Sequence, residues 1–182
     1  GLACCAVIIL YVVNELTYDT FHEDHDRIYR INGYQTSQVG EHYMASSPRA
    51  FGPEIRNNFP QVEAVTRVIP PYENADNVLV VKDDKRFFET RVFFVNNAAF
   101  RIFHMLFKQG GPEQALLRPF TVVITESTAK KYFGDRNPLG DILQIEIDYD
   151  IGIENVKLQD YEVTSVIQDA PSNTHFKYDM LL

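Results

Sequence analysis

The first residues of the chain form an apolar run that limits what the protein can be. Residues Leu2–Val13 read LACCAVIILYVV and contain no charge, glycine or proline. A membrane-spanning helix needs roughly 20 such residues, and this run follows a first residue that is not Met. No basic segment precedes it and no small-residue cleavage site follows it, which argues against a signal peptide. We expect Leu2–Val13 to be the trailing half of a membrane helix; the alternative is a buried terminal helix or strand.

Composition excludes some classes of protein. The 182 residues include 17 Lys and Arg against 25 Asp and Glu, a formal net charge of -8. Nucleic-acid binding favours a basic face, so we expect no nucleic-acid partner. Hydrophobic residues make up 45% of the chain, enough for a sizeable core. The only cysteines, Cys4 and Cys5, are adjacent and cannot link distant parts of the fold.

Beyond the apolar run, short strands alternate with short helices, which indicates an α+β fold with more strand than helix. The predicted strands have alternating or continuous apolar residues: 27–36, 41–46, 62–69, three runs within 77–95, 120–124, 141–147, 161–168 and 176–182. One helix is predicted to start at Ser47-Pro48, and another spans 96–107, with Phe100, Phe103 and Phe107 on its core face. A third, 126–133, has Thr125 as N-cap and Gly134 just beyond its end.

Two breaks divide the chain. Pro70-Pro71 and Gly110-Gly111-Pro112 interrupt the pattern of strands and helices. We take them to bracket a second, smaller β-rich lobe inserted into the main lobe. The expected divisions are 1–19 (end of a membrane helix and link), 20–70 and 113–182 (main lobe), and 71–112 (inserted lobe).

The stretch TFHEDHDRIYR, residues 20–30, is the strongest candidate for a metal site. His22 and His25 are three positions apart, and zinc motifs on a helix place two histidines four apart beside a glutamate. The other histidines are His42, His104 and His175, and no spacing supplies a third ligand. We prefer a short helix capped by Thr20, with Glu23 completing a capping box and both histidines exposed.

No other motif predicts catalysis or a cofactor. The sequence lacks the GxxxxGK[ST], GxGxxG and GxSxG patterns of phosphate loops and nucleophile elbows. The acidic stretch 148–154 places glycine and the final acid at the wrong positions for an EF-type calcium loop. We therefore expect no catalytic, cofactor-binding or metal residues, and no enzyme.

Four segments resemble one family of membrane proteins. They are NELTYDTFHEDHDRIYRI after the apolar run, NNFPQVEAVTRV, TVVITESTAKKYFGDRNPLGDILQI and EVTSVIQDAPSNTHFKYDMLL. Together they resemble the extracytoplasmic core of FtsX-like and MacB-like ABC transporter permeases. The stretch 122–143 is quite specific, whereas residues 70–107 match only loosely.

The resemblance implies a MacB-like periplasmic core of two lobes, one of them a mixed β-α-β lobe, in the bacterial inner membrane. It also implies a cytoplasmic ABC ATPase subunit or domain, a permease dimer and a possible periplasmic partner. In such systems ATP-driven movement is relayed through the membrane helices to the outer domain, and export of a substrate is one outcome. The family contributes no catalytic or metal residues.

A relay of this kind requires a stiff connection between the membrane helix and the outer domain. We expect the capped turn at Thr20 to run directly into the strand 27–36, with Phe21, Ile28 and Tyr29 packing this connection. Two other classes of protein stay open: the ligand-binding or sensing outer domain of another membrane-anchored receptor, and a membrane-tethered enzyme, which the motif search disfavours.

Overall fold

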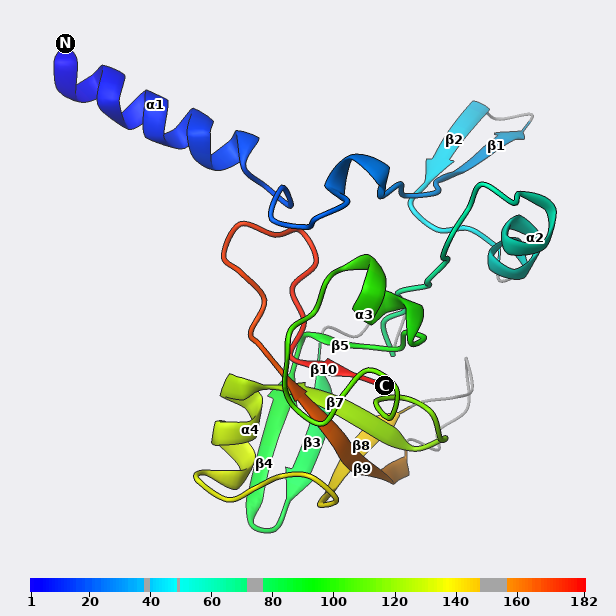
Figure 1. Cartoon of the computed structure of the whole chain (residues 1–182), viewed down its shortest axis with the longest axis vertical. Coiled ribbons are helices and arrows are strands. Elements are labelled where there is room, and N and C mark those ends of the chain that lie inside the picture. Colours follow the sequence, from blue (N-terminus) through cyan, green and yellow to red (C-terminus); the bar gives the residue numbers. More distant parts are fainter. Residues whose placement is uncertain (38–39, 49, 72–76, 148–156) are drawn as a thin grey trace.

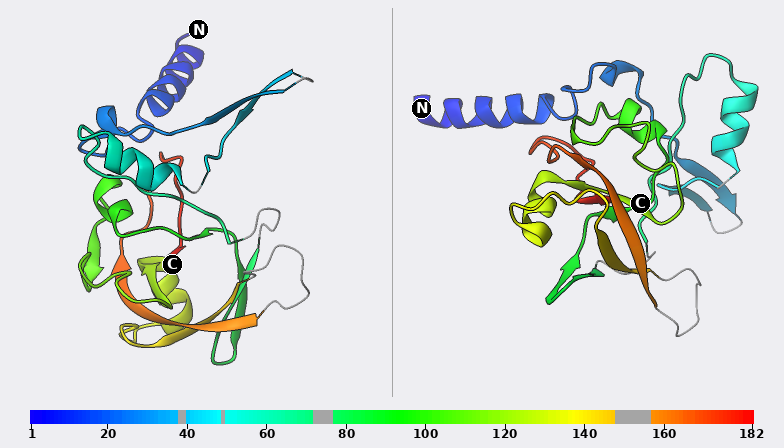
Figure 2. Two further views of the ribbon diagram at one scale, coloured as in Figure 1. Left: turned by 90° about the vertical axis from the view of Figure 1, so that its right-hand side faces the viewer. Right: turned by 60° about the horizontal axis from the view of Figure 1, so that its bottom comes forward.

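The body of the protein is one mixed sheet, and a long helix and a small hairpin leave it in different directions (Figure 1, Figure 2). The structure is a computed structural model and describes residues 1–37, 40–48, 50–71, 77–147 and 157–182. The acidic stretch 148–154, considered above for calcium, lies outside the described residues.

The described helices differ greatly in how they pack. Only α3 and α4 bury side chains, whereas α1 and α2 bury none. The α-helices are α1 (Leu2–Leu16), α2 (Phe51–Asn58), α3 (Ala98–Ile102) and α4 (Glu126–Phe133), and a single 3-10 turn, η1, covers His25–Arg27.

The strands form two sheets. The small one pairs β1 (Gly33–Ser37) with β2 (Gly40–Met44). The large one contains β3 (Val78–Lys82), β4 (Lys85–Glu89), β5 (Val92–Phe93), β6 (Phe107–Gln109), β7 (Thr121–Thr125), β8 (Ile142–Ile147), β9 (Lys157–Ile167) and β10 (Met180–Leu181).

Strand β9 organises the large sheet. The strand order is β4-β3-β8-β9-β7-β10-β5, and β6 also pairs with β9. Strands β7 and β9 are parallel, whereas β8 runs antiparallel to β9, so the sheet is mixed. The sheet curves until it is nearly closed, and α4 covers one side of it (Figure 1, Figure 2).

The core lies on both faces of this sheet, which explains the continuous apolar run in β7. Val122 and Ile124 pack with Tyr132 of α4 in one cluster. Val123 points the other way and packs with Phe100 and other residues in a second cluster. A strand buried on both faces has no polar side to alternate with its apolar side.

The expected inserted lobe is not a separate sheet. Residues 71–112 contribute β3, β4, β5 and β6 to the same sheet as residues 113–182. Val80 pairs with Ile145 of β8, and β6 pairs with β9. The fold is α+β, as expected, but the double proline and double glycine mark loops within one sheet.

Several expected boundaries were wrong. Of the strand expected over 62–69, only a bridge between Ile69 and Phe94 forms among the described residues. The strand expected over 176–182 is limited to β10. The helix expected over 96–107 ends at Ile102, because His104 has a left-handed backbone (φ 45°) and the chain then enters β6. The prediction that Phe100, Phe103 and Phe107 face the core is confirmed.

The segment between η1 and β3 has almost no core of its own. Neither apolar cluster includes a residue from the described part of 28–71. The hairpin β1–β2 is exposed along nearly its whole length and carries a pair of tyrosine rings, Tyr34 and Tyr43, 5.0 Å apart. An isolated two-stranded hairpin is only marginally stable in water.

Candidate functional site

Helix α1 presents an unpacked apolar surface. All of its residues are exposed, including Ile8 and Ile9 at 61% each. Within the described part of the chain, α1 and the other helices are too short or too polar to cross a membrane. Leu2–Val13 is helical, as the expected end of a membrane helix would be, and none of its side chains is buried.

Helix α1 ends where the chain meets the loop between β9 and β10, residues 168–179. We call residues 17–27, this loop and the end of α3 the junction. The Asn173 side chain donates to the Thr17 carbonyl (3.0 Å), and the Asp19 amide donates to the Asn173 carbonyl (3.0 Å). These bonds connect α1 to the large sheet through residues more than 150 positions away.

Asp19 holds the junction together. Its Oδ1 accepts from the Thr174 hydroxyl (2.5 Å) and the His175 amide (3.1 Å), and its Oδ2 lies 2.6 Å from His175 Nδ1. Burial raises the pKa of this carboxyl, but the bonds from Thr174 and His175 outweigh it and hold the pKa below its usual value. The carboxylate is therefore the form that the junction stabilises.

His22 lies in the interior of the junction. It is 7% exposed, and its ring contacts Phe21 (4.1 Å between centroids) and Phe103 (5.8 Å). The expectation that His22 is exposed on a capped turn was wrong. The Thr20 hydroxyl donates to the Thr17 carbonyl and caps no helix, and η1 begins only at His25 with Asp24 before it.

The environment of His22 disfavours its charged form. Burial lowers its pKa, and nearby His104 and His25 lower it further, whereas Asp19 acts in the opposite sense. The rings of His22 and His104 are 6.3 Å apart, and Nδ1 of each is buried without a hydrogen-bond partner. His25 remains exposed, and its Nδ1 lies 3.1 Å from the His22 carbonyl oxygen.

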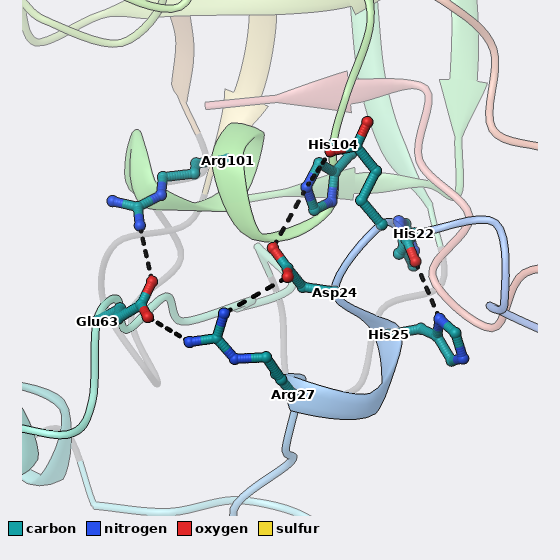
Figure 3. Close-up of polar contacts among 8 residues, drawn as sticks. His22, Asp24, His25, Arg27, Glu63, Arg101 and His104 are labelled. Atoms are coloured by element: carbon teal, nitrogen blue, oxygen red, sulfur yellow. Dashed lines mark hydrogen bonds and ion pairs between the residues drawn. The ribbon is translucent and has the colours of Figure 1, made fainter.

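Ion pairs cover the outer side of the junction (Figure 3). Arg27 bonds Glu63 and also lies 3.5 Å from Asp24, and Arg101 lies 3.0 Å from Glu63. His104 Nε2 is 3.7 Å from Glu23 and from Asp24. These side chains are mostly exposed, so each pair stabilises little by itself. Together they fix the position of η1 against the end of α3.

The residues expected to pack the connection are only partly the right ones. Phe21 lines a small pocket with His22, Phe103 and Phe176. Tyr29 is 82% exposed and packs nothing there. The chain also does not run directly from a helical turn into a strand, because β1 starts only at Gly33. The connection is made to α3 and to the β9–β10 loop instead.

Sequence reasoning missed the partners of the junction because they are distant in the chain. These loop partners lie in the short stretch between the predicted strands 161–168 and 176–182. Asn, Thr and His there could bond a backbone or a carboxylate, but no local pattern assigns Asp19 as their partner. Among the described residues, no group of three His, Cys, Asp or Glu side chains could hold a metal ion.

A second hollow lies on the other side of the β9–β10 loop. This hollow is open to solvent and has a volume of about 240 Å³. Its lining includes Arg91, Ser127, Asp169 and Asp179. Asp169 Oδ1 accepts from the Ser127 amide (3.1 Å) and hydroxyl (2.7 Å), so it already occupies the N-terminus of α4. Ligand pockets usually enclose about 300–1,000 Å³, so this hollow is small for a ligand site.

Comparison with known proteins identifies a related family. A family model described as MacB-like periplasmic core domain matches residues 1–182, the whole chain. No match was found among curated proteins.

Two solved structures share the fold. A domain described as part of a permease protein from Porphyromonas gingivalis has a TM-score of 0.56 and 25% identity, covering 72% of this chain and 54% of that one. The extracellular domain of the noncanonic ABC-type transporter YknZ from Gram-positive bacteria has a TM-score of 0.52 and 16% identity, covering 75% of this chain and 62% of that one. The chain thus spans 54% and 62% of the length of these two domains.

The chain belongs to the MacB-like periplasmic core domain family. It is a periplasmic or extracellular domain of an ABC transporter permease, as the resemblance of its four segments predicted.

Proposed function

We propose that this domain couples ATP-driven movement of the permease's membrane helices to events outside the membrane, such as export of a substrate. In this proposal α1 is the end of the first transmembrane helix, residues 1–19 are that end and its link, and the large sheet is the part that α1 moves. The work is mechanical and requires no catalytic or cofactor-binding residue in this domain.

The observation that carries the proposal is the way in which α1 is attached. An apolar helix with no packed face is stable in lipid but not in water, which supports a place for α1 in the membrane. Immediately after it, Asp19 is bonded to Thr174 and His175. A displacement of α1 is therefore transmitted to the loop that connects β9 and β10.

The partners follow from the same proposal. Energy would come from a cytoplasmic ABC ATPase subunit or domain, and two permease copies would act as a dimer in the bacterial inner membrane. A periplasmic partner protein would receive the movement. The family supports these partners, and the proposal includes no nucleic acid.

Co-purification tests the assignment most simply. The intact permease, extracted from membranes, should bring down an ABC ATPase at a fixed ratio, and the complex should hydrolyse ATP. Recovery of the protein from membranes without an ATPase, but with a kinase or other signalling module, would instead support the outer domain of a sensory receptor.

A further inference from the structure

We propose that protonation of His22 loosens the junction between α1 and the large sheet, so that the coupling responds to the pH outside the cytoplasm. This inference rests on the proposed function and adds regulation to it. It starts from His22 and His104, two histidines of the junction that the coupling itself does not use.

The first step is that His22 has no room for the water that a charge needs. Its pocket encloses about 10 Å³, which is at the lower limit of roughly 10–15 Å³ for a single water. The pocket wall is largely apolar and is formed by Phe21, Phe103, Pro171, Thr174, Phe176 and Tyr178. An imidazolium here would lose hydration, and the Phe103 backbone and the charge of Asp19 offset that loss only in part.

The second step concerns the charged groups around His22. On its own segment, Asp19 favours the charge, but Thr174 and His175 of the β9–β10 loop already bond both of its oxygens. His25 on the same segment opposes the charge, as does His104 at the end of α3.

The third step is that His104 strengthens this opposition when it gains a proton. Its Nε2 lies 3.7 Å from both Glu23 and Asp24, so a protonated His104 would form two ion pairs. Its charge would then stand beside the His22 ring, 6.3 Å away between centroids. A charge on His104 would therefore oppose a charge on His22.

The direction of the effect follows from linkage. Burial holds the pKa of His22 below its ordinary value, so the released segment binds a proton more readily than the docked one. The docked state is therefore fully stabilised above about pH 6.5, the ordinary histidine value. As the pH falls toward the lower pKa of docked His22, the docked state becomes less stable. The equilibrium constant for opening then rises by up to about tenfold for each pH unit.

Hydrogen–deuterium exchange on the intact permease in lipid nanodiscs measures this opening directly. Protection factors, corrected for the intrinsic exchange rate, would be compared at about pH 7.5 and about pH 5.5. We expect residues 17–27 and 171–176 to lose protection at the lower pH while the central strands β7 and β9 keep theirs. Equal protection of the junction at both pH values would overturn the proposal.

Variants identify the histidine responsible. His22→Leu fills the pocket with an apolar side chain that cannot take up a proton, so the loss of protection at low pH should disappear. The matched control is His42→Leu, which alters an exposed histidine on β2 and should keep the response. A response that persists in His22→Leu contradicts the assignment.

If His22→Leu fails to fold, the variant His104→Gln provides a second test of the pH response. It removes a neighbouring positive charge that opposes protonation of docked His22, so a given fall in pH should open the junction less and the midpoint of opening should move to lower pH. An unchanged midpoint, or a shift to higher pH, would contradict the assignment.

The two proposals can fail separately. The pH proposal is wrong, and the coupling proposal stands, if protection of the junction does not change with pH but a flexible insertion between Leu16 and Thr17 still abolishes transport. If that insertion leaves transport unchanged, the coupling proposal is wrong whatever the exchange data show.

Discussion

At the scale of single residues, Asp19 combines a backbone and a side-chain requirement. Its φ is 57°, in the left-handed region where Asp and Asn are tolerated better than most residues. Its carboxylate bonds two residues of the β9–β10 loop. The position therefore favours a short acidic side chain.

Asp19→Asn should weaken the junction while keeping the backbone conformation. The loss of the charged contact with His175 should lower the free energy of unfolding by about 1 kcal/mol, a modest value because solvent screens the partly exposed pair. Chemical denaturation would measure it. Asp26→Asn, the same change at an exposed position of η1, should have little effect. Equal losses in both variants would contradict the role of Asp19.

The contribution of Asp19 should also depend on pH. Its pKa in the folded chain is below the ordinary value, so its stabilising effect is complete above about pH 4 and is lost as the pH falls through the lower, folded value. The difference in stability between the wild type and Asp19→Asn should therefore shrink below about pH 4. Denaturation curves across this range would test it, and a difference that grew with acidity would contradict it.

The candidate site shows which residue properties a sequence reveals. A polar cluster at residues 20–30 could be recognised as unusual, but the burial of His22 could not. Its neighbours Phe103 and His104 follow directly after α3, and Phe176 lies in the β9–β10 loop. Burial by distant segments leaves no periodic pattern in the short stretch around the residue itself.

At the scale of elements, α4 was predicted best. Thr125 is its N-cap and accepts a hydrogen bond from the Thr128 amide, and Gly134 follows its end with φ 66°. These signals are local, because a cap bonds only the first turn of its own helix. The predictions of strands over 62–69 and 176–182 were wrong for the opposite reason. A strand requires a continuous neighbouring strand, and the local pattern does not specify that neighbour.

Thr125→Ala should destabilise the domain through this cap. The Thr125 hydroxyl also bonds the Thr128 hydroxyl (2.9 Å) in a buried setting, so we expect a loss of about 1–2 kcal/mol in the free energy of unfolding. Thr125→Ser keeps the hydroxyl and should lose much less. Thermal or chemical denaturation would compare the two, and equal losses would show that the cap contributes little.

At the scale of the whole molecule, the α+β class was predictable but the arrangement of the sheet was not. Prolines and glycines report where the chain turns, whereas membership of a sheet depends on pairs far apart in sequence. Strand β3 joins β8, and residues 71–112 thereby become part of one sheet. The connection expected after the apolar run was likewise placed on the wrong elements, because its bonds go to the β9–β10 loop and not to a strand over 27–36.

The central claim is that α1 moves the sheet because the junction is stiff. A short Gly-rich insertion between Leu16 and Thr17 would separate α1 from the contacts of Thr17 and Asp19 with the β9–β10 loop, and flexible linkers transmit little force. The control is the same insertion in the exposed turn at Asp83-Asp84 between β3 and β4, far from the junction in Figure 1.

The most direct test is transport by the intact permease and its ATPase carrying each insertion, with ATPase binding measured in the same preparation. We predict that the insertion between Leu16 and Thr17 abolishes transport while ATPase binding is retained, and that the insertion at Asp83-Asp84 leaves both intact. Undiminished transport with the insertion between Leu16 and Thr17 would contradict mechanical coupling through the junction.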